Sequence, residues 1–188
     1  LYDVLGDKRG AIVAIDPMNG GILGLASAPT YDANSFIGGI SQAEYSALQV
    51  DRDTPLFNRA LRGQYPPGST IKPMIGLVGL HYGAVSWKSE YFSRGFFQLP
   101  GNEHKYRDWK EWGHGRVKMD KAIIESCDTY FYDMAVRLGI DQMSEGMKHF
   151  GFGRRQGRDI QGDLPGILPS RDWKRACFKW CIKGIRSV

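Results

Sequence analysis

The sequence lacks long apolar runs and is poor in cysteine. No stretch of about 18 consecutive apolar residues occurs, so no segment is typical of a membrane-spanning helix. No signal-peptide pattern opens the chain, because charged residues soon follow Leu1, and we expect these residues to come from the middle of a longer protein whose export signal or anchor lies upstream. The three cysteines are too few and odd in number for a disulfide framework, and the Cys177–Cys181 pair lacks the second pair of a metal site.

Internal repeats and low-complexity tracts are also missing. The chain has 188 residues, of which 42% are hydrophobic and 24% charged, and this composition predicts one soluble, globular domain rather than a disordered, collagen-like or coiled-coil chain. The net charge of +5 comes from scattered basic residues, whereas a nucleic-acid-binding surface is more often a basic stripe interleaved with aromatic residues. We therefore predict a solvated basic surface and no nucleic-acid partner.

Two short apolar segments near the start of the chain predict a β-hairpin. Residues 11–16 and 22–27 are apolar runs separated by a turn that contains an Asn-Gly pair. Both runs are nearly continuous in apolar character, which predicts a sheet covered on both faces. Ser41 and Glu44 then form the pattern of a capping box, which predicts a helix that runs to about Val50.

Four more helices are predicted further along the chain. The first begins near Gly68 after a rigid double-proline turn, and Pro73 is close enough to its start to be tolerated. Residues 84–117 are rich in glycine, tryptophan and charge without steady periodicity, which predicts a long functional loop, and another loop is expected beyond about Gly153. The four helices are expected at residues 68–82, 119–125, 128–138 and 141–150. In the third, Phe131, Met134, Ala135 and Leu138 fall on one face at helical spacing, which predicts an apolar face.

The strongest chemical signal is a Ser-x-x-Lys pattern at the start of a predicted helix. Ser69 is a poor nucleophile until a base removes its proton, and Lys72 lies three residues later on the same helix face, within reach of that hydroxyl. Partial burial of the lysine favours loss of its proton, and the backbone N–H groups of a helix start suit a developing oxyanion. The alternative is a capping serine beside a surface lysine. The double-proline turn and the apolar helix that follows favour the catalytic interpretation.

A second serine lies at the predicted break between two helices. Ser126 is placed to relay a proton to a leaving amine, and Asp128 is placed to orient Ser126 or to hold Lys72. The alternative is that Asp128 merely caps the helix that follows it, a role compatible with the catalytic one.

These two motifs together resemble the first two motifs of penicillin-binding proteins and serine β-lactamases. Several flanking segments are similar to class B penicillin-binding proteins, and others to their elongation subgroup, penicillin-binding protein 2. The class B segments are residues 9–17 (RGAIVAIDP), 27–34 (SAPTYDAN), 58–60 (NRA) and 65–73 (YPPGSTIKP). The elongation-type segments are residues 98–101 (QLPG), 106–110 (YRDWK), 112–115 (WGHG) and 169–174 (PSRDWK).

The resemblance implies a D,D-transpeptidase that cross-links peptidoglycan and is acylated by β-lactams. Ser69 would attack the D-Ala-D-Ala bond of a stem peptide, Lys72 would be its base, and Ser126 would relay the proton; no cofactor is required. The implied fold is the mixed α/β (α+β) architecture of penicillin-recognising enzymes, an antiparallel sheet beside a mainly helical subdomain. The implied location is the periplasmic face of the bacterial inner membrane, and the implied partners are elongation-complex membrane proteins, including a glycan-polymerising glycosyltransferase.

The sequence departs from the family pattern in its last third. The Lys-Ser/Thr-Gly motif is missing from the chain, since Lys183-Gly184 lacks the middle hydroxyl, and the match fades after Arg175. We therefore expect residues 1–188 to be a partial transpeptidase domain without the strand that carries this motif. An exposed sheet edge, poor solubility and loss of turnover by this chain alone are the expected consequences.

A sparse set of residues suits one zinc ion. They are Asp108, His114 and Cys127. Carboxylate, imidazole and thiolate together suit Zn²⁺, and some elongation-type members with this set resemble zinc-binding proteins. Their fourth ligand is an Asp at the position of Ser93, so a water molecule, Glu103 or His104 is left to fill the fourth place. The alternative is a buried cysteine beside a hydrogen-bonded histidine.

Two other functions of the same fold remain open. A serine β-lactamase would hydrolyse its acyl-enzyme, but no residue placed to activate a deacylating water is evident. A non-catalytic β-lactam-binding or scaffold module is favoured by the missing third motif and disfavoured by the retained Ser69, Lys72 and Ser126. Trp109 and Trp112 are expected to pack within the loop rather than to bind a ligand.

Overall fold

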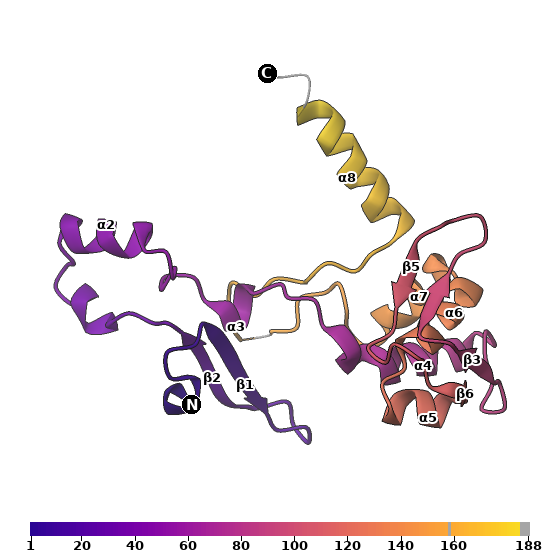
Figure 1. Ribbon diagram of the computed structural model, residues 1–188. Helices are drawn as coiled ribbons and strands as arrows, with labels where there is room; N and C mark the ends of the chain where they lie inside the picture. The colour runs from indigo at the N-terminus through magenta and orange to yellow at the C-terminus, as the bar shows by residue number, and fades with distance from the viewer. Residues whose placement is uncertain (158, 185–188) are drawn as a thin grey trace. The chain divides into compact units, whose positions relative to one another are not determined.

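The computed structural model describes residues 1–157 and 159–184 (Figure 1). Its backbone divides into two compact units, which we describe separately. Unit 1 comprises Leu1–Tyr65 and Gln156–Leu164, and unit 2 comprises Pro66–Arg155 and Pro165–Val188. No helix in the described part of the chain is both long and apolar enough to cross a membrane.

Unit 1 contains the predicted hairpin. Strands β1 (Gly10–Ile15) and β2 (Ile22–Ala28) pair antiparallel, with Gly10 opposite Ala28 and an irregularity between Ala14 and Ile15. The Asp16 carboxylate accepts hydrogen bonds from Met18 N and Asn19 Nδ2, which closes the turn.

The hairpin is less buried than its apolar sequence predicts. Among the described residues, Val13, Ile15, Ile22 and Leu23 are all exposed, so the expectation of a sheet covered on both faces is wrong for this chain. A two-stranded sheet has too little neighbouring structure to cover both of its faces.

The helices of unit 1 are short. They are α1 (Tyr2–Leu5), the 3₁₀ turn η1 (Ala33–Phe36), α2 (Gln42–Val50) and α3 (Arg59–Arg62). The predicted capping box is confirmed, because the Ser41 hydroxyl accepts from Glu44 N and the Glu44 carboxylate accepts from Ser41 N. The buried guanidinium of Arg59 donates to the carbonyls of Asp53 and Thr54, so its charge is satisfied by backbone oxygens.

Unit 2 holds the buried hydrophobic clusters. Figure 1 shows α4, α6 and α7 gathered together, and α6 contacts both of the others. The predicted apolar face of α6 is confirmed, since Phe131, Met134 and Leu138 are buried. The helical elements are η2 (Gly68–Ile71), α4 (Lys72–His81), α5 (Met119–Ile124), α6 (Asp128–Leu138), α7 (Ile140–Lys148) and α8 (Arg171–Gly184).

Two expectations for unit 2 are wrong. Residues 84–117 are not one long loop, because they contain four three-residue strands: β3 (Tyr91–Ser93), β4 (Phe96–Gln98), β5 (Lys105–Arg107) and β6 (Gly115–Val117). Strand β3 pairs antiparallel with β6, and β4 pairs antiparallel with β5. Such short strands carry too few residues for an alternating pattern to be visible.

Helix α8 is the other difference, because a loop was expected beyond Gly153. The Ser170 hydroxyl accepts a hydrogen bond of 3.0 Å from Trp173 N, and Asp172 lies in the first turn. This N-terminal cap starts a helix directly after a glycine- and proline-rich segment.

Candidate active site

The predicted nucleophile lies in a tight turn that leads into α4. Gly68 has a φ of +58°, a conformation that glycine adopts without steric cost, and it lets the chain turn from the double proline into η2. Ser69 follows in η2 and is exposed, and Lys72 is the first residue of α4. Pro73 falls in the first helical turn, where its missing N–H has no intrahelical acceptor to lose.

Lys72 is buried and held by three oxygen atoms. Its Nζ donates to Asp128 Oδ1 at 2.6 Å, to the Ser126 carbonyl at 2.8 Å and to Ser126 Oγ at 3.0 Å. Lys72 is only 7% exposed, and its Nζ also lies 5.6 Å from the centre of the Phe131 ring. The structure thus brings Lys72, Ser126 and Asp128 together. Within the described residues, the Ser69 hydroxyl itself makes no hydrogen bond.

Ser126 has an unusual backbone conformation. It joins α5 to α6 with a φ of +52°, in the left-handed region that residues other than glycine rarely adopt. Backbone hydrogen bonds on both sides fix it, from Ser126 N to the Ile123 carbonyl and from Cys127 N to the Ala122 carbonyl. This conformation directs both the carbonyl and the hydroxyl of Ser126 at Lys72, at a cost of about 1–3 kcal/mol.

Next to this turn, beginning at Cys127, lies a buried cluster of Asp108, His114 and Cys127. One ligand atom from each residue lies within 4.8 Å of the other two. His114 Nε2 is 3.1 Å from Asp108 Oδ1, and Cys127 Sγ donates to Asp108 Oδ2 at 3.5 Å. All three residues are buried, so the structure brings together the residues predicted as metal ligands.

Asp108 also anchors the start of α6. Its Oδ2 accepts a hydrogen bond from Thr129 N at 3.1 Å, which satisfies a backbone donor in the first helical turn. Burial would raise the pKa of Asp108, but the hydrogen bonds from the Thr129 and Lys110 N–H groups and from His114 outweigh it, and the pKa is lowered. Asp108 is therefore an ionised carboxylate that fixes the turn carrying Ser126.

Two buried hydroxyls complete the surroundings of the cluster. Thr129 Oγ1 donates to Ser93 Oγ at 2.8 Å and lies 3.3 Å from Asp108 Oδ2, and Ser93 Oγ also accepts from His114 N at 3.3 Å. Ser93 therefore lies beside the cluster without entering the set of three. The close crossing of the chain here requires Gly113, since a Cβ at that position would collide with the Ser93 carbonyl.

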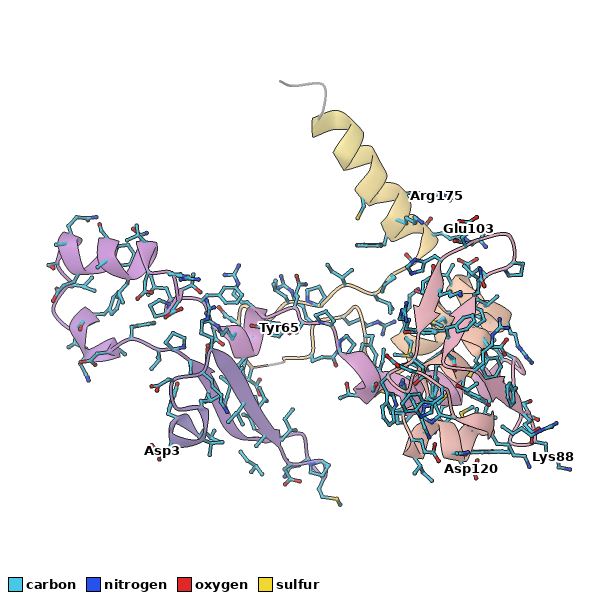
Figure 2. All side chains as sticks on the ribbon, in the orientation of Figure 1. Asp3, Tyr65, Lys88, Glu103, Asp120 and Arg175 are labelled. Carbon is cyan, nitrogen blue, oxygen red and sulfur yellow. The ribbon has the colours of Figure 1, made fainter. Side chains whose placement is uncertain are left out.

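The other residues considered for the fourth metal position lie elsewhere. Glu103 and His104 are exposed in the loop between β4 and β5, and Figure 2 shows Glu103 on that loop. Trp112 is 80% exposed, so its predicted packing role is wrong, whereas the Trp109 ring packs against His114 at a centroid distance of 5.5 Å.

Sequence reasoning missed Glu125. Its Oε2 lies 2.8 Å from His114 Nδ1, and this hydrogen bond lowers the pKa of the Glu125 carboxyl. The two residues lie eleven positions apart on different elements, and no motif links them.

Comparison with known proteins assigns the fold that places these residues. The model of the penicillin-binding protein transpeptidase domain matches residues 10–182, so the chain belongs to this family. A peptidoglycan D,D-transpeptidase MrdA from Acinetobacter baumannii is 54% identical over 170 residues, which are 90% of this chain and 25% of that protein.

Solved structures agree with this assignment and confirm the predicted α/β penicillin-binding fold. The PBP2 of Pseudomonas aeruginosa in complex with WCK 5153 is 48% identical, with a TM-score of 0.88 over 95% of this chain and 40% of that one. The complex between PBP2 and MreC from Helicobacter pylori gives 38% identity and a TM-score of 0.88 over 95% of this chain and 33% of the other.

Proposed function

We propose that this chain carries the nucleophile half of a serine D,D-transpeptidase that cross-links peptidoglycan. The observation that supports it most is the buried Lys72 held by Ser126 and Asp128, one helical turn after the exposed Ser69. Membership of the transpeptidase domain family and the 54% identical D,D-transpeptidase support the same reaction. The family's acyl transfer requires no cofactor.

In the proposed acylation, Ser69 Oγ attacks the carbonyl carbon of the penultimate D-Ala of a stem peptide. The neutral form of Lys72, in equilibrium with the ammonium paired to Asp128, takes the Ser69 proton, and a proton from the Lys72–Ser126 pair passes to the amide nitrogen as the C–N bond breaks and D-Ala leaves. Ser126 suits this relay because its hydroxyl lies 3.0 Å from Lys72 Nζ. The amine of a neighbouring stem peptide then attacks the ester, and Ser69 recovers its proton.

Asp128 has a positioning role in this scheme. Its carboxylate, 2.6 Å from Lys72 Nζ, fixes the amine of Lys72 at the Ser126 hydroxyl and stabilises its charged form. The N–H groups at the start of η2 and α4 offer one side of an oxyanion site. We propose that the Lys-Ser/Thr-Gly strand of the family, which lies outside residues 1–188, supplies the other.

The test is D-Ala release and cross-linked product formation by the purified full protein, with its Lys-Ser/Thr-Gly strand, given a pentapeptide stem donor and an amine acceptor. We expect both in the wild type and neither in Ser69→Ala. A chromogenic β-lactam then separates the transpeptidase from a β-lactamase. We expect one slow stoichiometric reaction, and rapid multiple turnover would contradict the proposal.

We further propose that Asp108, His114 and Cys127 hold one structural zinc ion. The donors fit, because a carboxylate, an imidazole nitrogen and a thiol lie within 4.8 Å of one another, close to the roughly 3.5 Å between ligands of a tetrahedral site. A water molecule is the proposed fourth ligand, since Glu103 and His104 lie outside the cluster. The ion would replace the hydrogen bonds that now join the three side chains and would brace the turn at Ser126.

Metal analysis of the purified protein tests this proposal. We expect about one zinc per chain, lost in Cys127→Ser, and a lower melting temperature after chelation. Metal-free protein whose stability is unchanged by chelators and by added zinc would contradict it.

The proposed location is the periplasmic face of the bacterial inner membrane, where stem peptides are cross-linked. The proposed partners are elongation-complex membrane proteins and a glycosyltransferase that polymerises glycan. The Helicobacter pylori PBP2 that resembles this chain forms a complex with MreC, which supports a partner of that kind. Pull-down of the full protein with a purified MreC-type partner tests this assignment, and absence of binding would count against it.

A further inference from the structure

His114 is held at both of its ring nitrogens by carboxylates. Nε2 faces Asp108 Oδ1 at 3.1 Å, inside the buried cluster, and Nδ1 faces Glu125 Oε2 at 2.8 Å, on its outer side. The His114 side chain is completely buried, whereas the Glu125 side chain is 36% exposed. Glu125 therefore lies between the cluster and solvent, in the position next to Ser126.

Glu125 is fixed by more than its bond to His114. Lys121 Nζ lies 3.9 Å from the second carboxylate oxygen and donates to the His114 carbonyl at 3.0 Å. Trp109 Nε1 donates to the Glu125 backbone carbonyl at 3.1 Å, and the Trp109 ring packs against His114. These contacts fix the position of the Glu125 carboxylate, whereas a glutamate that is only solvated at the surface makes no such set of contacts.

A metal ion bound to His114 determines which ring nitrogen carries the proton. Coordination uses the lone pair of one ring nitrogen, and the neutral ring then carries its proton on the other. Nε2 is the nitrogen that faces Asp108 and the cluster, so the proton must lie on Nδ1. A buried N–H needs an acceptor, and Glu125 is the group that provides one.

We propose that Glu125 is a positioning residue for this metal centre. Its carboxylate accepts the Nδ1 proton of His114, selects the tautomer with a free Nε2, and fixes the orientation of the ring. The inference rests on the proposed zinc ion, and it assigns to Glu125 a role distinct from that of the three ligands.

Zinc affinity measured by competition with a chromogenic chelator tests the proposal on the purified protein. We expect Glu125→Ala to weaken zinc binding about 10- to 100-fold, the range found when an outer partner of a ligand histidine is removed. Glu125→Gln keeps an amide oxygen that can accept the Nδ1 proton, so we expect it to recover most of the affinity. Glu111→Gln is the matched control, because Glu111 lies in the turn between Asp108 and His114 and, in the described part of the chain, its carboxylate makes no hydrogen bond or ion pair.

Cobalt replacement separates positioning from unfolding. With excess Co²⁺, Glu125→Ala should still give the thiolate-to-cobalt absorption band, which shows that the cluster has remained folded. Equal zinc affinity in wild type and Glu125→Ala would overturn this inference while the zinc proposal stands. A wild-type protein that binds no zinc would overturn both, and the transpeptidase assignment would be unaffected.

Discussion

Removal of the Asp128 carboxylate is expected to leave the Lys72 ammonium buried without its counter-ion. Lys72 is 7% exposed and the Asp128 side chain 26% exposed, so the pair is mostly shielded from water. Breaking a fully buried pair from one side costs about 3–5 kcal/mol. Two hydrogen bonds from Lys72 to Ser126 remain, and water reaches Asp128, so we expect Asp128→Ala to lower the free energy of unfolding by about 2–3 kcal/mol.

A double-mutant cycle isolates the interaction between the two side chains. Lys72→Met removes the charge and keeps an apolar chain above the Phe131 ring, and we expect it to cost about 1 kcal/mol. The double variant should cost little more than Lys72→Met alone, which gives a coupling energy of about 2 kcal/mol. Urea unfolding followed by tryptophan fluorescence supplies the four free energies.

The matched control is the ion pair of Asp133 and Arg137 on the same helix, in which the cation is half exposed and the carboxylate about as buried as that of Asp128. These residues form an i,i+4 ion pair at 2.7 Å, but the Arg137 side chain is 50% exposed, so we expect a coupling below about 0.5 kcal/mol. A Lys72–Asp128 coupling no larger than that of this control would refute the description of Lys72 as a buried, counter-ion-dependent lysine.

Three further predictions concern single features of the structure. Ser126→Ala and Ser126→Gly should both slow acylation by benzylpenicillin about 100-fold or more, because both remove the Ser126 hydroxyl. The glycine variant should be more stable than the alanine variant by about 1 kcal/mol, because glycine adopts a positive φ without strain. Equal stability of the two variants would contradict the strain at this position. Tyr130→Phe should leave the free energy of unfolding unchanged or slightly raised, because the buried Tyr130 hydroxyl has no hydrogen-bond partner in the described residues; a loss above about 1 kcal/mol would reveal a partner. The pKa of Glu44 is lowered by its hydrogen bonds from Ser41, so its contribution to α2 is complete above the ordinary glutamate pKa of about 4.3 and is lost as the pH falls through its lower folded value. Amide exchange in α2 should therefore be faster in Glu44→Gln than in wild type at pH 7, and this difference should shrink as the pH falls below about 4. A difference that stays constant as the pH falls would contradict this account.

Local signals made much of the fold predictable. The Asn-Gly turn, the Ser41–Glu44 capping box and the apolar face of α6 each depend on residues close in sequence, and all three were confirmed. The three-residue strands of residues 84–117 depend on pairing partners up to 26 positions apart, such as Tyr91 and Val117, and single-sequence patterns do not reveal such partners.

Some features of the candidate site were likewise predictable from the sequence, and others were not. Short spacing linked Ser69 with Lys72 and Ser126 with Asp128, and the resemblance to penicillin-binding proteins joined these two motifs. The structure brings Lys72, Ser126 and Asp128 into hydrogen-bond contact. The positive φ of Ser126 had no signal in the sequence, because serine has no preference for that conformation. The bond from His114 to Glu125 was equally hidden, since it depends on how α5 lies against the loop before it.

The intact mass of the purified protein before and after benzylpenicillin tests the central claim most directly. We predict one stoichiometric adduct in the wild type, none in Ser69→Ala, and a slowly formed adduct in Ser126→Ala, which keeps the nucleophile but lacks the relay. An adduct that persists in Ser69→Ala would contradict the assignment of Ser69 as the acylated residue. Absence of an adduct in the folded full protein, which includes the Lys-Ser/Thr-Gly strand, would contradict the acyl-transfer function itself.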